Sequence, residues 1–207
     1  MDTYGDNHRP AVAARTSYRR EAAEYTDEQN EKLIAYLVKN RHTTPLEFCG
    51  ATFFMVMPIF VARQLVRHRT ASINEESLRY VDARNEFYVP TVEECLKQSQ
   101  TNKQGAGDEP VDDPEAVRKA IAAANNRAYR SYLDLLEMGL TKELARGVLP
   151  LNTYTGWYWC CDLHNILHLL TLRTHEHAQR QTRAYALAML ELLRPVFPAV
   201  IAAWEMP

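Results

Sequence analysis

Residues 51–79 read ATFFMVMPIFVARQLVRHRTASINEESLR. The run 51–57 is short, continuous and apolar, which predicts a buried strand that ends at Pro58. Residues 59–66 then predict a helix, because a proline just before the first turn favours helix initiation. Residues 67–79 follow directly and combine arginines, an imidazole and small hydrogen-bonding side chains. Because these cations emerge from the end of a buried element, we expect their side chains to be anchored and to bind an anion.

The rest of the chain predicts many helices and few strands. Patterns of apolar residues, caps and breakers indicate helices over residues 26–39, 114–138, 141–148, 157–172 and 177–193. A second short strand is expected at 87–89, and an exposed loop at 98–114, where the chain is polar and carries two glycines. We therefore predict an α+β fold with a small central sheet flanked by helices and a helix-rich C-terminal half. No internal repeat is evident, which favours a single domain over 1–207.

Bulk composition excludes several classes of protein. The 207 residues carry 24 Lys+Arg against 26 Asp+Glu, so no global positive field would attract nucleic acid or a membrane surface. No apolar stretch is long enough to span a bilayer, and the first residues are too polar for a signal peptide. The four cysteines lack the spacing of metal ligands, which favours reduced thiols. These features predict a soluble cytoplasmic protein without nucleic-acid or membrane partners.

The segment 67–79 matches the pattern Arg-His-Arg-x-x-Ser-x-Asn-x-x-Ser-x-Arg in full. With this motif the chain resembles the flavin-dependent thymidylate synthases. Seven fixed positions would coincide by chance about 10⁻⁹ of the time per start site, so the signal is specific. The resemblance covers most of the chain, since residues 14–18, 42–47, 58–64, 102–105 and 143–150 also look like family segments.

This resemblance implies methylation of dUMP to dTMP. It further implies methylenetetrahydrofolate as the carbon donor, FAD as the redox centre, NADPH as the reductant, and a homotetramer with shared active sites. By the same resemblance the pyrimidine is activated without a covalent cysteine. A guanidinium beside the ring would then stabilise the developing enolate. That guanidinium is Arg173, which local sequence alone would interpret as an arginine at a helix C-terminus.

The resemblance also implies a set of dUMP contacts. Ser77 is expected to position the substrate near the reacting pyrimidine, because no base that would make it a nucleophile is evident nearby in the sequence. The arginines would neutralise the phosphate. The expected dUMP residues are Gln64, Leu65, Val66, Arg67, Glu75, Glu76, Ser77, Leu78, Arg79, Arg146 and Arg173, of which Ser77 and Arg173 are the expected catalytic residues.

A second implied set holds FAD. Its expected members are Thr44, Arg67, His68, Arg69, Glu75, Asp162, Leu163, His164 and His168. His42 is expected to line the flavin or folate pocket. The sequence has no Gly-x-Gly-x-x-Gly, which excludes a Rossmann-type dinucleotide site. His164 and His168 lie four residues apart, but no acidic third ligand is placed beside them, so no metal site is expected.

Two other functions are compatible with the same arginines. One is a noncatalytic nucleotide- or RNA-binding module, which would show a wide basic surface and no flavin. The other is a flavin enzyme that methylates a different pyrimidine nucleotide. Phe48 and Gln181 depart from the residues often found in the family, which leaves the FAD contacts less defined than the dUMP contacts. The domain over 1–207 is expected to be either complete or without the N-terminal strand that relatives usually carry.

Overall fold

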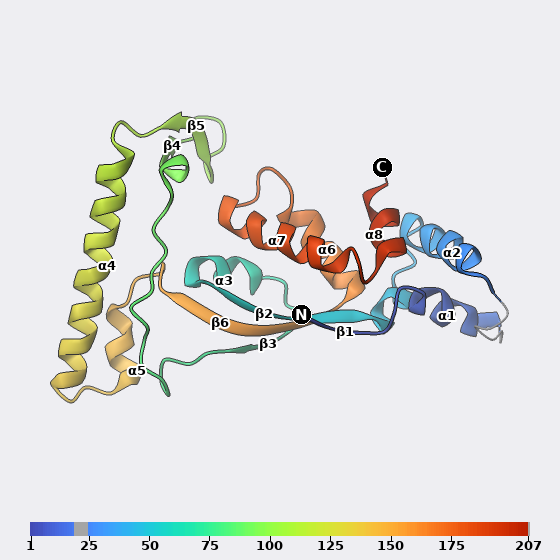
Figure 1. Cartoon of the computed structure of the whole chain (residues 1–207), viewed down its shortest axis with the longest axis horizontal. Helices are drawn as coiled ribbons and strands as arrows, with labels where there is room; N and C mark the ends of the chain where they lie inside the picture. The colour runs from blue at the N-terminus through green and yellow to red at the C-terminus, as the bar shows by residue number, and fades with distance from the viewer. Residues whose placement is uncertain (19–24, 207) are drawn as a thin grey trace. The chain divides into compact units, whose positions relative to one another are not determined.

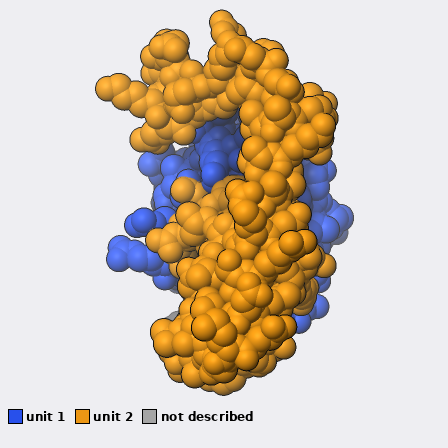
Figure 2. All heavy atoms as spheres, turned by 90° about the vertical axis from the view of Figure 1, so that its left-hand side faces the viewer, with its two compact units in different colours: residues 1–55, 67–74, 158–207 blue, residues 56–66, 75–157 orange. Residues whose placement is uncertain are grey.

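The computed structural model describes residues 1–18 and 25–206. The chain forms two compact units (Figure 2). The first comprises residues 1–55, 67–74 and 158–207, and the second comprises 56–66 and 75–157. The boundary falls within three strands, so each unit holds part of them. Segments that are distant in sequence therefore meet inside each unit.

A four-stranded sheet has the order β1-β2-β6-β3. Its members are β1 (Asp2–Tyr4), β2 (Gly50–Pro58), β3 (Ser72–Glu75) and β6 (Tyr154–Asp162). Strand β1 runs antiparallel to β2 and pairs Thr3 with Ala51. The predicted strand at 51–57 is confirmed, and Pro58 ends it as expected. The α+β fold class is also confirmed.

The first unit contains several helices (Figure 1). They are α1 (Arg9–Arg15), α2 (Asp27–Lys39), α6 (Leu163–Arg173), α7 (Arg180–Leu193) and α8 (Pro198–Glu205), with 3₁₀ turns η1 (Thr16–Tyr18) and η3 (Thr44–Phe48). The N-terminus of α2 is fixed by a capping box, in which Thr26 and Gln29 bond each other's backbone N–H groups. Helix α2 packs against α8, and α6 packs against α7.

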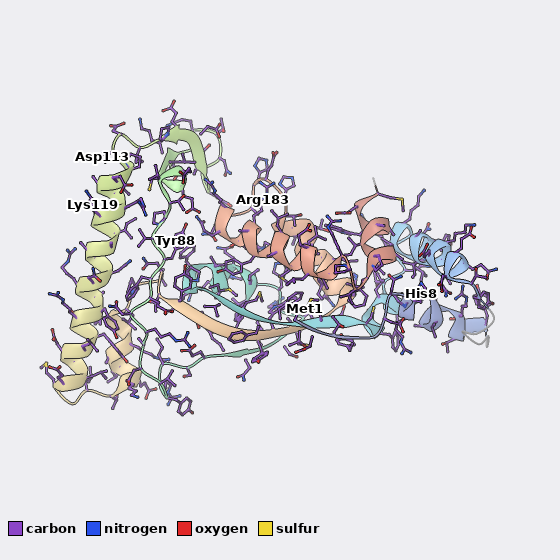
Figure 3. The ribbon with its side chains drawn as sticks, in the orientation of Figure 1. Met1, His8, Tyr88, Asp113, Lys119 and Arg183 are labelled. Carbon is purple, nitrogen blue, oxygen red and sulfur yellow. The ribbon has the colours of Figure 1, made fainter. Side chains whose placement is uncertain are left out.

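The second unit contains α3 (Ile59–Leu65), α4 (Pro114–Glu137) and α5 (Lys142–Ala145). Short 3₁₀ turns η4 (Val92–Glu94) and η5 (Arg146–Val148) accompany them. At the start of α4 the Asp113 carboxylate accepts from the Ala116 backbone N–H at 2.9 Å (Figure 3). Just past its end Gly139 has φ 84°, a left-handed conformation that other residues rarely adopt. The predicted helix over 114–138 is thus confirmed, together with its stop.

Three sequence-based predictions were wrong. Residues 157–162 are strand and not helix, and α6 begins only at Leu163. The exposed loop predicted at 98–114 includes a hairpin of β4 (Leu96–Gln98) and β5 (Ala106–Pro110). Residues 87–89 form an isolated bridge between Phe87 and Thr153, not a strand. Aromatic residues favour strands, and tertiary pairing overrides weak local preferences.

Each unit has its own buried side chains. In the first unit Phe53 lies 6.2 Å from Trp159, between ring centroids. In the second unit Tyr132 is 0% exposed and forms a cluster with Ala83 and Ala145. Among residues 1–18 and 25–206, no helix combines the length and apolar character needed to cross a bilayer.

Candidate active site

A cavity of about 490 Å³ lies in the second unit. Small-molecule pockets typically have volumes of this order. Five of the residues predicted to bind dUMP line it, namely Glu75, Glu76, Ser77, Leu78 and Arg146. The other lining residues are Ile59, Gly147, Leu149, Tyr154 and Thr155. The cavity thus combines a cation, two carboxylates, hydroxyl groups and an apolar wall.

Local structure explains why these side chains converge. Strand β3 ends at Glu75, residues 76 and 77 have no regular structure, and a turn follows over 78–80. The Glu76 backbone N–H donates to the Gly156 carbonyl at 2.8 Å, which fixes this exit against β6. The Ser77 hydroxyl accepts from the Arg79 backbone N–H at 3.4 Å. The end of the strand and the segment that follows it thus place four successive residues, 75–78, at the cavity.

Glu143 connects two arginines predicted to contact the phosphate. Its carboxylate lies 3.3 Å from Arg79 Nε, and its backbone carbonyl accepts from Arg146 Nε at 3.2 Å. A third pair joins Arg84 to Glu76 at 3.4 Å. The guanidiniums are therefore oriented by acidic and carbonyl oxygens, an arrangement suited to a dianionic ligand.

A second cluster of predicted residues lies in the first unit. Arg173, at the end of α6, donates from Nε to His68 Nε2 at 3.0 Å. The His68 ring also faces the His168 ring, with centroids 6.2 Å apart. Burial, together with the nearby Arg173 and His168, lowers the pKa of His68 to about 4. His68 is therefore neutral near pH 7, with its proton on Nδ1 and Nε2 as the acceptor. Burial also lowers the pKa of Arg173.

The first unit contains a larger cavity of about 740 Å³. His164 and His168 from α6 line it together with Thr43, adjacent to the predicted Thr44. Aromatic and basic side chains from other elements complete the wall, including Tyr36, Lys39, Arg41 and Trp204. Aromatic and cationic groups in one cavity suit a large anionic ligand with flat rings.

The remaining predicted residues lie outside the linings of these two cavities. Leu65 and Leu163 are 0% exposed, so neither their side chains nor their backbone atoms are open to solvent. Asp162 caps α6 by accepting from Asn165 N at 2.9 Å. The others are Gln64 on α3, Val66 just after it, the exposed Arg67 and Arg69, Thr44 at the start of η3, and His42, whose ring centroid lies 5.6 Å from that of Tyr36.

Several residues that line the cavities were not predicted from the sequence. Tyr154 and Thr155 belong to β6, whose aromatic run 157–159 we had predicted to open a helix. Residues 157–161 are all aromatic residues or cysteines, so buried and exposed residues alternate there only in the structure. The aromatic residues, which are enriched in strands, were the available sequence signal. Tyr36 and Trp204 carry no local signal, because only the packing of α2 against α8 brings them to one cavity.

The chain is similar to known proteins over almost its whole length. The family model described as thymidylate synthase complementing protein matches residues 1–199. The flavin-dependent thymidylate synthase of Wolbachia pipientis wMel is 43% identical over 207 residues, covering 99% of this chain and 72% of the relative. The chain belongs to the flavin-dependent thymidylate synthase family. It is therefore an enzyme, which decides against the noncatalytic alternative.

A further member of this family and two solved structures are also similar to the chain over almost its whole length. The enzyme of Gluconobacter oxydans (strain 621H) is 43% identical over 99% of this chain and 68% of its own length. A UMP/dUMP methylase, PolB from Streptomyces cacaoi bound with 5-Br dUMP, has a TM-score of 0.90 at 33% identity, covering 99% of this chain and 92% of that one. The same methylase bound with 5-Br UMP has a TM-score of 0.88 at 32% identity, covering 99% of this chain and 91% of that one. The resemblance derived from residues 67–79 is thus confirmed.

Proposed function

We propose that this flavin-dependent thymidylate synthase converts dUMP to dTMP, with methylenetetrahydrofolate as carbon donor and NADPH as reductant. The observation that carries the proposal is the 490 Å³ cavity, where Glu75, Ser77 and Arg146 meet. A pyrimidine nucleotide needs cations for its phosphate and polar groups for its sugar and base. The cavity supplies both, next to an apolar wall.

Arginines account for phosphate binding in this proposal. Arg146 lines the cavity, and Arg79 is held beside it through Glu143. Bidentate guanidinium–phosphate bonds supply both charge and geometry. Arg67 is proposed as a third phosphate ligand, with Gln64, Leu65 and Val66 as neighbouring contacts. Glu76 and Leu78 complete the set next to Ser77.

Arg173 is proposed to activate the pyrimidine. C5 of uracil is a weak nucleophile, and a guanidinium beside a ring carbonyl would stabilise the negative charge that develops as C5 attacks. His68 accepts from Arg173 Nε, and this bond would hold the guanidinium in one orientation. A neutral His68 adds no competing positive charge near Arg173.

The cysteines favour a mechanism without a covalent thiolate. Thiolates, not thiols, act as nucleophiles. Burial raises the pKa of Cys49 to about 12 and that of Cys161 to about 11. Cys95 is buried, and the described lining of the 490 Å³ cavity includes neither it nor Cys160. We therefore propose that Ser77 positions dUMP and that no cysteine forms a bond to it.

FAD is the proposed flavin cofactor. Its pyrophosphate requires cations, its adenine and flavin rings require flat or aromatic walls, and the donor set of the first unit fits these needs. His164 and His168 line the 740 Å³ cavity with Tyr36 and Trp204. When bound, the flavin supplies the reducing chemistry. The residues proposed to hold it are Thr44, Arg67, His68, Arg69, Glu75, Asp162, Leu163, His164 and His168.

A homotetramer with shared active sites is proposed, in the cytoplasm. Phe54 and Tyr158 are 58% and 53% exposed, with ring centroids 5.0 Å apart. Exposed paired aromatics on a sheet are typical of surfaces that another subunit covers. All four cysteines are free thiols, which agrees with a reducing compartment. The domain over 1–207 is proposed to act as one catalytic chain within this assembly.

A second substrate, UMP, is favoured by one observation. Two similar solved structures are of a protein described as a UMP/dUMP methylase, and their ligands are 5-Br dUMP and 5-Br UMP. We therefore propose that UMP be tested as an alternative substrate.

The deciding experiment incubates purified protein with methylenetetrahydrofolate, NADPH and either dUMP or UMP, with and without added FAD. Mass spectrometry then measures the methylated nucleotide. FAD-dependent dTMP from dUMP would support the main proposal, and product from UMP alone would replace it with the alternative. Folded protein with bound flavin that methylates neither nucleotide would overturn both.

A further inference from the structure

Thr155 makes a hydrogen bond that the proposed dUMP contacts do not include. Its hydroxyl donates to Glu75 Oε1 at 2.7 Å, across 80 residues of sequence. Thr155 lies on β6 and is only 8% exposed, whereas Glu75 ends β3. Both residues line the 490 Å³ cavity. The bond therefore sits in the wall of the proposed nucleotide site.

We propose that Thr155 is a positioning residue that sets the affinity for the pyrimidine nucleotide through Glu75. This inference rests on the proposed function. A carboxylate accepts hydrogen bonds and donates none, while a uridine nucleotide offers few donors, chiefly its sugar hydroxyls and the ring N–H. Glu75 is the group suited to bind one of these donors. Thr155 fixes one oxygen of Glu75 and so holds the other in a defined place.

Thr155 would raise the affinity for the nucleotide by restricting the rotamers of the Glu75 side chain before binding. A glutamate side chain has several rotatable bonds, and ordering it on ligand binding costs free energy. Glu75 is exposed, so without a partner its carboxylate would sample several rotamers. The hydroxyl of a buried, β-branched threonine has few rotamers of its own. Thr155 therefore orders Glu75 before the nucleotide arrives.

The surrounding backbone lets this role be separated from folding. The Glu76 N–H bonds the Gly156 carbonyl at 2.8 Å, and this bond joins the two segments whether or not residue 155 carries a hydroxyl. Valine has the shape and strand preference of threonine. Serine keeps the hydroxyl but lacks the methyl group. The two variants thus distinguish the hydrogen bond from packing.

The test measures dUMP affinity by calorimetry, and KM and kcat, on flavin-loaded wild type, Thr155→Val and Thr155→Ser. Loss of a hydrogen bond to a charged group predicts about a 10-fold weaker affinity and higher KM for Thr155→Val, with kcat nearly unchanged. Thr155→Ser should bind dUMP like wild type. Wild-type affinity in Thr155→Val, or equal losses in both variants, would overturn the inference, since the latter indicates a packing role.

A double-mutant cycle checks that Thr155 acts through Glu75. In a Glu75→Ala background, Thr155→Val should cause no further loss of dUMP affinity. If the two substitutions lower the dUMP affinity by factors that multiply in the double variant, Thr155 and Glu75 act independently, and the inference is overturned. Wild-type protein that binds neither dUMP nor UMP would refute the proposed function and this inference together. Wild-type binding with an unaltered Thr155→Val affinity would refute only the inference.

Discussion

His68 should make the stability of this protein depend on pH in a defined window. Burial and its neighbours Arg173 and His168 lower the pKa of His68 from 6.5 to about 4 in the folded protein. The unfolded chain keeps the ordinary value of about 6.5. Between these two values the unfolded chain binds more protons than the folded protein. The free energy of unfolding therefore falls as the pH decreases from about 6.5 to about 4, and the His68 contribution is constant outside that window.

The change in the free energy of unfolding follows from the lowered pKa of His68. Each pH unit inside the window changes the free energy of unfolding by about 1.4 kcal/mol. Over the whole window the loss from His68 is about 3 kcal/mol, an order-of-magnitude figure for a side chain that is 8% exposed. This is a large part of the stability of an ordinary domain.

The assay is urea unfolding at several pH values between 4 and 7 for wild type and His68→Gln, at one fixed flavin occupancy. Glutamine keeps an oxygen that can accept from Arg173 but does not titrate in this range. Other histidines and carboxylates contribute equally to both proteins, so the difference between the two curves isolates His68. The free energy of unfolding of wild type minus that of His68→Gln should fall by about 3 kcal/mol between pH 7 and pH 4. Parallel curves, or an NMR titration of His68 near pH 6.5, would refute the reasoning.

Three further changes test other parts of the structure. Arg173→Ala should lower kcat at least about 100-fold while FAD absorbance is retained, as expected for loss of an enolate-stabilising group; near-normal turnover would exclude that role. Ser77→Ala should lower kcat/KM for dUMP far more than alanine at any of the four cysteines, and one inactive, folded cysteine variant would indicate covalent chemistry. Tyr132→Phe should cost about 1–3 kcal/mol in urea unfolding, because the buried Tyr132 hydroxyl accepts from the Ala83 N–H at 3.1 Å. Tyr129→Phe is the matched control, because the Tyr129 hydroxyl makes a longer hydrogen bond of 3.3 Å to the Ala83 carbonyl. An equal loss of unfolding free energy in the two variants would contradict the value expected for Tyr132→Phe.

Local sequence signals predicted the elements whose causes are local. The capping box of Thr26 and Gln29 starts α2, and Gly139 stops α4, because these residues satisfy or release backbone groups within one turn. The apolar run before Pro58 predicted β2 for the same kind of reason. Strand β6 was missed because its position between β2 and β3 depends on partners far away in sequence.

The sequence by itself determined the family, since residues 67–79 place seven specific side chains at fixed spacing. It also determined the α+β class, which follows from the predicted helices and strands. It also predicts which residue types would bind an anion. Only the tertiary structure decided which of them share a cavity. Thr155 reaches Glu75 across 80 residues, and Arg173 reaches His68 across 105. Hydrogen bonds of this kind depend on the pairing of strands and the packing of helices, whose register a local pattern does not encode.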